Sequence, residues 1–261
     1  MDFYFDESKH PGRGDFVVGA FVGTRDDPPA EIAAALHAEG LVPGTDEYKS
    51  CAKMSAHPEQ ARLRDRLRQV LLWKGQIALV ILPYSELPSL GKEALSAFKQ
   101  LIAKYSWPPG TAHRAFFDQQ VFRSIAAADR TVKAALLPSE IQVHVEQDSR
   151  QVLELQLADL AAHTCSMMLL EQLGLLAKQV KAGENSGYDP DLDISLGFEL
   201  WAGCRYSFFS GRPPRIEEMK SILDHKVQVS GYGLFISEGC PPTLRAAAEA
   251  RFGEMYLGCI H

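Results

Sequence analysis

Short apolar runs that stop abruptly at polar or turn-forming residues recur along the first two-thirds of the chain. Runs of this length that are rich in β-branched and aromatic residues are typical of strands. Five strands are predicted on this basis, at residues 3–5, 16–23, 75–82, 113–118 and 141–146. Pro11, Gly12 and Gly14 separate the first two, so we expect these two strands to form an antiparallel hairpin with a loop.

Between these runs, apolar residues return every three or four positions, which is the period of an amphipathic helix. Helices are predicted at residues 28–37, 58–74, 89–105, 119–136 and 150–179. The last of them is apolar on nearly every face, which predicts a buried helix. Strands that alternate with helices favour an α/β fold, and the opening hairpin predicts a mixed sheet of five strands flanked by helices.

The C-terminal third carries a different and weaker pattern. Residues 183–193 have the composition of a loop or linker, and two strands (203–209 and 226–236) and a helix (242–252) are predicted after them. We therefore divide the chain into an α/β domain at 1–180 and a C-terminal α+β extension at 181–261. The extension contains no motif, and it is compatible with a small subdomain, an oligomerisation surface that would form a homo-oligomer, or a substrate-recognition element.

The composition is that of an ordinary soluble globular protein, with 46% hydrophobic and 23% charged residues in 261. No targeting segment and no apolar run long enough to span a membrane is visible, so a cytoplasmic protein is expected. The net charge of −6 argues against a protein that coats nucleic acid, although it leaves room for a nuclease with local basic residues. Arg62, Arg64, Arg66 and Arg68 form one basic run, which we interpret as a solvated helix face.

The cysteines indicate reduced thiols rather than disulfides. There are five, an odd number, and their spacings are wide. Zinc is a further option because four suitable residues occur late in the chain. These are Cys204, Cys240, Cys259 and His261. The absence of closely spaced ligand pairs argues against a structural zinc site.

Two predicted strands end in an aspartate, Phe-Tyr-Phe-Asp6 and Ala-Phe-Phe-Asp118. In α/β sheets, active sites tend to form at the carboxyl ends of strands, so two such acids can converge on one point. The alternative is that each aspartate only begins a turn, which aspartate often does.

A third acid, Asp159, lies in the long apolar helix, within the stretch Leu155-Gln-Leu-Ala-Asp-Leu-Ala-Ala-His163. Gln156, Asp159 and His163 fall on one stripe of a helix. A carboxylate on a buried helix is costly unless it is paired or binds a metal. Asp159 is therefore either a metal ligand or a carboxylate that is hydrogen-bonded to an arginine or to nearby backbone.

These residues carry a resemblance to a known family. An aromatic first strand followed by Asp6-Glu7-Ser8, then Glu47-Tyr48-Lys49, a strand-end Asp118 and Leu155-Gln-Leu-Ala-Asp159 resembles the domain of unknown function 3800 family. The resemblance covers residues 1–180 and implies a ribonuclease-H-like fold. One residue departs from the family pattern: Lys9 stands where the family usually has glycine. Without the resemblance, Glu47 and Lys49 would be interpreted as solvated surface.

The resemblance implies a cluster of four acids that holds two Mg²⁺ or Mn²⁺ ions through oxygen ligands. Asp6 on a central first strand would bridge the ions, Asp118 and Glu47 would hold one, and Asp159 would hold the other. Lys49 would pair with a scissile phosphate or with Glu47. Further roles follow for a few neighbours. His163 would transfer a proton, or is a packed core histidine, and Glu7, Ser8 and Gln156 would orient the ligands.

Two such ions activate a water and stabilise the leaving oxygen of a phosphodiester. The sequence therefore predicts a metal-dependent phosphodiester hydrolase, a nuclease with nucleic acid as its substrate. Two alternatives are open. One is a catalytically silent ribonuclease-H-like module that binds nucleic acid or a protein, and the other is a hydrolase of nucleotides or small phosphate esters.

Overall fold

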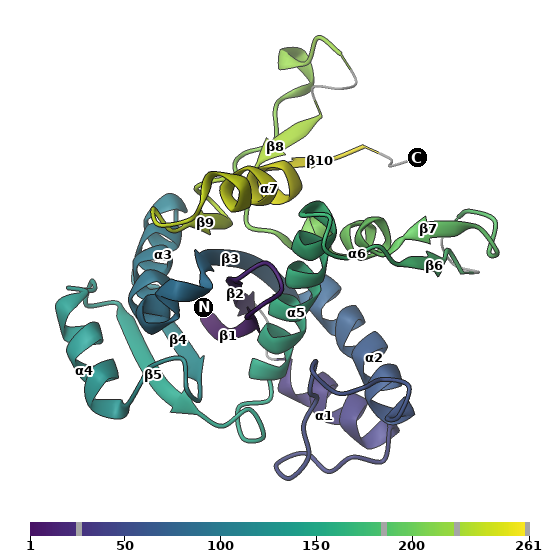
Figure 1. Cartoon of the computed structure of the whole chain (residues 1–261). Helices are drawn as coiled ribbons and strands as arrows, with labels where there is room; N and C mark the ends of the chain where they lie inside the picture. The colour runs from purple at the N-terminus through teal and green to yellow at the C-terminus, as the bar shows by residue number, and fades with distance from the viewer. Residues whose placement is uncertain (25–27, 184–186, 222–224, 259–261) are drawn as a thin grey trace.

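A mixed sheet of six strands forms the centre of the protein, as the computed structural model shows (Figure 1). The structure describes residues 1–24, 28–183, 187–221 and 225–258. The sheet consists of β1 (Asp2–His10), β2 (Phe16–Thr24), β3 (Gly75–Pro83), β4 (His113–Asp118), β5 (Ile141–Gln147) and β9 (Leu234–Ile236). Their order is β5-β4-β1-β2-β3-β9, so β1 lies in the interior of the sheet.

The pairing directions make this sheet mixed, as the sequence predicted. β1, β2 and β3 form an antiparallel meander, whereas β4 runs parallel to β1 and β5 runs parallel to β4. All five strands expected in residues 1–180 are present, although several are longer than predicted.

The sixth strand corrects the predicted count of five. A continuous strand was expected at 226–236, but Gly231 has a φ of 73° and ends the first half in a turn. The segment therefore divides into β8 (Lys226–Gln228), which pairs with β10 (Glu254–Tyr256), and β9, which pairs in parallel with β3. The C-terminal residues thus complete the edge of the main sheet.

Seven α-helices occur in the described residues. They are α1 (Pro29–Ala38), α2 (Pro58–Lys74), α3 (Leu90–Lys104), α4 (Ile125–Ala134), α5 (Leu155–Gln172), α6 (Leu196–Cys204) and α7 (Pro242–Phe252). Short 3-10 turns are η1 (Tyr84–Ser89), η2 (Arg205–Ser207) and η3 (Ile216–Glu218). The strands β6 (Gln179–Lys181) and β7 (Asp193–Ser195) form a separate hairpin.

Three predicted elements differ from the structure. The helix expected at 150–179 is α5, which ends at Gln172 because Gly174 turns the chain with a φ of 71°. The helix expected at 119–136 starts later, where the Ser124 hydroxyl accepts a hydrogen bond from the backbone of α4. The strand expected at 203–209 is the end of α6 followed by η2, and only Phe208 bridges to β3.

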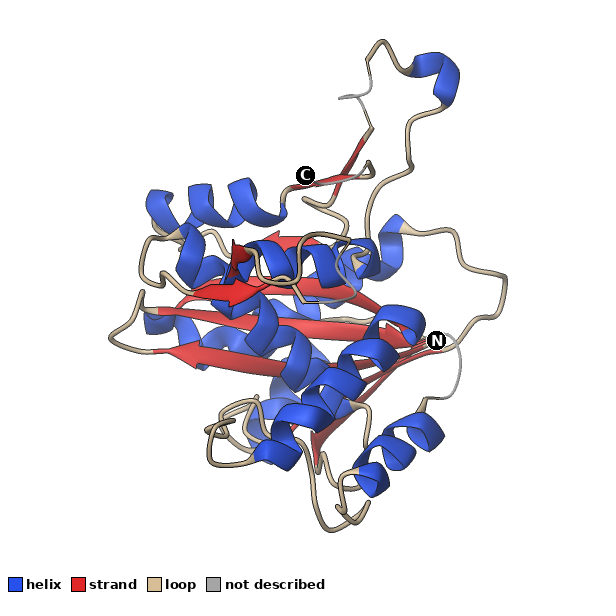
Figure 2. Cartoon of the chain, turned by 90° about the vertical axis from the view of Figure 1, so that its right-hand side faces the viewer, coloured by secondary structure: helices blue, strands red, loops and turns tan. Residues whose placement is uncertain are grey.

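Helices cover both faces of the sheet and create two hydrophobic cores (Figure 2). Side chains alternate between the faces of a strand, so β1 sends Phe3 and Phe5 toward α3, and Tyr4 toward α5. All three are buried, and each large apolar side chain contributes about 1.5–3 kcal/mol when fully buried. The α5 face is the one that receives the candidate site.

Among the described residues, no helix combines the length and the apolar character that crossing a membrane requires.

Candidate functional site

Two aspartates come together at the carboxyl ends of neighbouring parallel strands. The register of β1 and β4 pairs Phe5 with Phe117, and the next residues on the two strands are Asp6 and Asp118. Adjacent strands lie about 4.8 Å apart, so these carboxylates are neighbours. Alternation directs both to the face that carries Tyr4 and α5. The predicted convergence of the two strand-end acids is therefore present in the fold.

The third acid, Asp159, approaches the same point from α5. One carboxylate oxygen accepts a hydrogen bond of 2.9 Å from the Ser50 backbone amide, and the other accepts one from the Ser50 hydroxyl. The sequence left open whether Asp159 would be paired with an arginine or with backbone. Ser50, which is 109 positions away in the chain, is the partner that the structure provides.

The loop between α1 and α2 brings Glu47 to the cluster. The Ser149 hydroxyl donates a hydrogen bond to Glu47, and Lys49 Nζ lies 3.1 Å from Glu47 Oε2. The side chain of Glu47 is 21% exposed, so it is not the freely solvated residue that its position in a polar loop would indicate.

Gln156 fixes this loop against α5. Its side-chain oxygen accepts a hydrogen bond of 2.8 Å from the Tyr48 backbone amide, and its side-chain nitrogen donates one of 3.0 Å to the Ser149 carbonyl. Gln156 is completely buried. The side chain expected to orient ligands therefore links the segments that carry Glu47 and Ser149.

Burial and the charges of neighbouring acids raise the pKa values of the three aspartates, Asp6, Asp118 and Asp159. The pKa of Asp6 is well above its ordinary value because the group is desolvated and because the charges of Asp159, Glu7 and Asp118 act on it. Burial is also the main reason why the pKa of Asp159 is raised. Burial raises the pKa of Asp118 to about 6, although Lys49 opposes the shift. Such shifts mark a site where negative charge has been concentrated.

Lys49 is the positive charge within this group of acids. Burial alone would lower its pKa, but the ion pair with Glu47 and the charges of Asp159 and Asp118 raise it instead. Lys49 also lowers the pKa values of Asp118 and Asp159. The ammonium group therefore partly neutralises the cluster in this structure.

Glu7 lies beside the cluster but has a different partner. Its Oε1 is 2.5 Å from Lys9 Nζ, and its Oε2 is buried without a hydrogen-bond partner. Lys9, the residue that departs from the family pattern, thus neutralises Glu7. One buried carboxylate oxygen of Glu7 therefore has unused acceptor capacity, and the charge of Glu7 contributes to the raised pKa of Asp6.

The donor set suits Mg²⁺ or Mn²⁺, because all the ligands available are carboxylate and hydroxyl oxygens. Within the described part of the chain, however, no three His, Cys, Asp or Glu side chains are grouped closely enough to hold an ion as they stand. Binding would require Lys49 to leave Glu47 and the carboxylates to turn toward one another. The oxygen ligands therefore suit these ions chemically, but the side chains are too far apart in this structure to hold one.

His163 lies about one helical turn after Asp159 on α5. Its pKa is lowered by burial and by the positive charges of Arg64 and Arg68. Nearby, the Ser8 hydroxyl contacts His10 Nε2 and the Ser166 hydroxyl, each at 3.1 Å. His163 therefore faces a basic neighbourhood, and Ser8 contacts α5 rather than a candidate metal ligand.

Ser50 and Ser149, whose hydroxyls donate hydrogen bonds to Asp159 and Glu47, could not be recognised as partners of the acids from the sequence. An irregularity at the end of β5 was not predicted either. The pairing of β4 and β5 shifts between Phe116 and Asp118, and Glu146 there has a φ of 53°, which is unusual for a residue other than glycine. Bulges of this kind are common beside active sites, where they redirect side chains.

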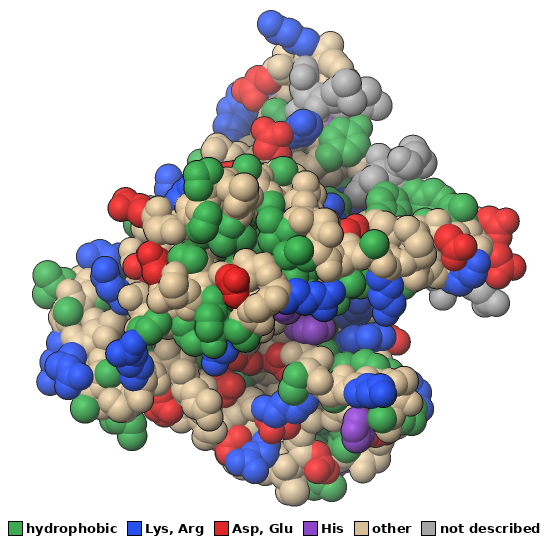
Figure 3. Space-filling model, viewed as in Figure 1, with side chains coloured by type: hydrophobic (Ala, Val, Ile, Leu, Met, Phe, Trp, Pro, Cys, Tyr) green, Lys and Arg blue, Asp and Glu red, His purple; other side chains and the backbone are tan. Residues whose placement is uncertain are grey.

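The basic run on α2 divides into two faces. Arg62 and Arg66 both donate to Glu39, at 2.5 and 2.7 Å, and so form a surface ion pair network. Arg64 and Arg68 point the other way and line a cavity. Figure 3 shows acidic side chains in a hollow near the centre of this face of the molecule, with basic groups beside them.

Only two of the four candidate zinc ligands, Cys204 and Cys240, lie within the described residues. Cys204 and Cys240 are buried free thiols. Cys259 and His261 lie outside the described residues. Burial raises the pKa of Cys240 to about 11, which disfavours the thiolate that zinc requires.

Comparison of the chain with protein-family models, with curated proteins and with solved structures finds no significant match.

Proposed function

We propose that this protein is a metal-dependent phosphodiester hydrolase, a nuclease whose acid cluster binds two Mg²⁺ or Mn²⁺ ions. One observation carries the proposal: Asp6, Glu47, Asp118 and Asp159 come from four separate segments, and their charges act on one another near the carboxyl ends of β1 and β4. Buried carboxylates that repel one another destabilise the folded protein, and a bound cation offsets this cost. Selection for function can retain such a costly arrangement.

The sheet supports the ribonuclease-H-like part of the proposal. That resemblance expects a mixed sheet with Asp6 on a central first strand, and β1 lies between β4 and β2. It also expects an acid at the end of a later strand and one on a long helix. Asp118 ends β4 and Asp159 lies on α5.

Each residue has a role that follows from its position. The charges of both Asp118 and Asp159 act on Asp6, so Asp6 would be the ligand shared by the two ions. Ser50 and Ser149 would hold the carboxylates of Asp159 and Glu47 in place. When bound, the ions would lower the pKa of a water and stabilise the leaving oxygen. Lys49, freed from Glu47, would bind a phosphate oxygen.

The test is cleavage of a panel of single-stranded and double-stranded DNA and RNA in Mn²⁺. Wild type should cleave at least one substrate, and Asp6→Asn and Asp159→Asn should abolish that cleavage. Asp129→Asn is the matched control because Asp129 is exposed on α4, which packs against α3 on the opposite face of the sheet from α5. No cleavage in the panel, or cleavage that survives both site substitutions, would refute the proposal.

Two observations favour a second candidate, the catalytically silent binding module. Lys49 forms an ion pair with Glu47 within the cluster, and no ready-made group of metal ligands occurs in the described residues. In that case oligonucleotide binding would occur without Mn²⁺, and no cleavage would follow.

A further inference from the structure

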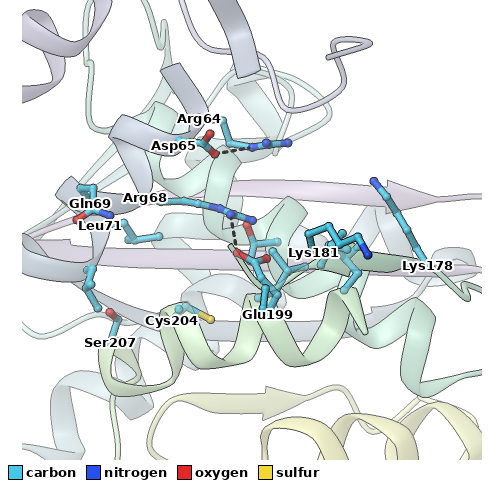
Figure 4. Close-up of a pocket in the computed structure, with 17 residues that line it drawn as sticks. Arg64, Asp65, Arg68, Gln69, Leu71, Lys178, Lys181, Glu199, Cys204 and Ser207 are labelled. Carbon is cyan, nitrogen blue, oxygen red and sulfur yellow. Dashed lines mark hydrogen bonds and ion pairs between the residues drawn. The ribbon is translucent and has the colours of Figure 1, made fainter. Parts of the chain in front are cut away.

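A cavity of about 530 Å³ lies between α2, α6 and the segment of β6, and Thr164 of α5 also lines it (Figure 4). Its size is typical of sites for small molecules and cofactors. Arg64 and Arg68 enter it from α2, and Lys178 and Lys181 enter it from the β6 segment.

The lining carries more positive than negative charge, although the whole chain has a net charge of −6. Four cationic side chains stand against two acids, Asp65 and Glu199. Arg68 Nη1 lies 3.1 Å from Glu199, and Arg64 Nε lies 3.3 Å from its exposed neighbour Asp65. Lys181 Nζ lies 3.0 Å from Asp193, which does not line the cavity. No acid of the described residues lies within ion-pair distance of Lys178. The charge of Lys178 is therefore available for an anion, and Arg64 has an exposed partner that an anion can replace.

The remaining wall of the cavity is apolar. Leucine side chains from α2 and α6 form it, namely Leu71, Leu72, Leu196 and Leu200. Leu72 is 38% exposed, so part of this wall faces solvent. A cavity with a cationic side and an apolar side suits a ligand that carries both a phosphate and a flat, weakly polar ring system. Nucleotides have this chemistry.

The cavity adjoins the acid cluster along α5. Thr164 lines the cavity and follows Asp159 by five positions, a rise of roughly 7.5 Å along the helix. The hydroxyl of Tyr48 is buried and has no hydrogen-bond partner among the described residues. The pKa of Tyr48 is raised by burial and by Asp159 and is lowered by Arg64 and Arg68. Charges of both sites therefore act on this one residue.

We infer that the cavity binds one nucleotide, with its phosphate at Arg64 and Lys178 and its base against the leucines of α2 and α6. The inference rests on the proposed function in one respect. It takes the bound nucleotide to be one unit of the nucleic-acid substrate, whose neighbouring phosphodiester would reach the acid cluster. A nucleotide unit of a polymer and a free mononucleotide have the same chemistry, and the experiment separates them.

The experiment measures binding of a fluorescein-labelled single-stranded oligonucleotide by anisotropy in EDTA, where no cleavage can occur. The test protein is Arg64→Ala combined with Lys178→Ala. The matched control is Arg62→Ala combined with Arg66→Ala, which removes the same charge from the opposite face of α2. Lys178→Glu alone serves as a second variant because the substituted side chain has no ion-pair partner to lose among the described residues.

Loss of two charged contacts should weaken binding about tenfold or more, and the slope of log affinity against log salt should decrease by about 1.4. The control should keep at least most of the wild-type affinity. Competition by a free nucleoside 5′-monophosphate would assign the site to a single nucleotide, and its absence would assign it to the polymer. Both results support the site.

Equal affinity in wild type and in both cavity variants would overturn the inference, as would an equal loss in the control. This outcome is independent of catalysis. If the cavity variants lose binding while wild type cleaves nothing in Mn²⁺, the proposed hydrolase fails and the nucleotide site stands. If wild type cleaves but the cavity variants bind normally, only the cavity assignment fails.

Discussion

Asp159 accepts hydrogen bonds from both the backbone amide and the hydroxyl of Ser50, the amide at 2.9 Å. This pair joins a buried helix to a polar loop that precedes it by 109 residues. The loop also carries Glu47 and Lys49, so the position of Asp159 and the position of these two residues depend on each other. The candidate site is therefore held together by contacts between the loop and α5.

Ser50→Ala tests this connection. The hydrogen bonds from Ser50 lower the pKa of Asp159, against the larger effect of burial, so removal of the hydroxyl should raise that pKa further. An unsatisfied buried partner costs about 1–3 kcal/mol in unfolding free energy. Urea unfolding measures the loss, and NMR titration measures the pKa. Ser139→Ala, at an exposed serine, is the control. Equal stability of both variants and wild type would contradict this account.

The raised pKa of Asp118 predicts a specific pH dependence. Its pKa in the folded protein is about 6, mainly because of burial, and its ordinary value is 3.8. The folded state thus favours the protonated acid, and the stability that this contributes is lost as pH rises through about 6. Asp118→Asn should leave stability near pH 4 unchanged and should increase it at pH 8 without divalent ions.

Thermal unfolding at several pH values measures this difference. Comparison of the two proteins is needed because burial lowers the pKa of His10 to about 4, which acts in the opposite direction on acidification. That contribution is common to both proteins and cancels. A wild type that is as stable as Asp118→Asn at pH 8 would show that burial does not destabilise the Asp118 carboxylate.

Divalent ions should remove this penalty. At a concentration one hundred times the dissociation constant, a ligand that binds only the folded state adds about 2.7 kcal/mol, or roughly 5–10 °C in Tm for a chain of this size. Mn²⁺ should stabilise wild type by this order, and Asp6→Asn should abolish the shift because Asp6 interacts with the most acids. Asp129→Asn should respond as wild type does. A shift that Asp6→Asn retains would place the ion elsewhere.

Lys49→Met should separate binding from turnover. Lys49 competes for Glu47 and reduces the negative charge felt by Asp118 and Asp159. Without it, Mn²⁺ should bind several-fold more tightly, which isothermal calorimetry measures, and the metal-free protein should melt earlier at pH 8. Cleavage should nevertheless decrease, because the side chain that binds phosphate is missing. If Mn²⁺ affinity decreases together with cleavage, Lys49 does not compete with the ion.

The sequence could predict the elements whose pattern is local. Strands ending at Asp6 and Asp118 are visible because apolar runs stop there, and the carboxylate of Asp159 stands out on an apolar helix. The α/β order favours parallel strands, but only the fold shows that β1 and β4 are the strands that pair. These three acids could therefore be selected one by one from the sequence, whereas their grouping was implied by the family resemblance.

Contacts between distant segments could not be predicted in this way. Ser50 and Ser149 are ordinary polar loop residues, and only the fold shows that they bind Asp159 and Glu47. β9 is three residues long, and its pairing with β3 depends on a turn at Gly231. Helix periodicity places Arg62 and Arg66 opposite Arg64 and Arg68, but only the fold shows that Glu39 is the partner of the first pair.

An anomalous difference map from a crystal soaked in Mn²⁺ is the most direct test of the acid cluster as a metal site. The soak should be made above pH 7, because the pKa of Asp118 is about 6 and the pKa values of Asp6 and Asp159 are also raised. We predict two peaks among Asp6, Glu47, Asp118 and Asp159, with Lys49 moved away from Glu47. A map without peaks at these carboxylates, and with Lys49 still paired to Glu47, would contradict the proposal.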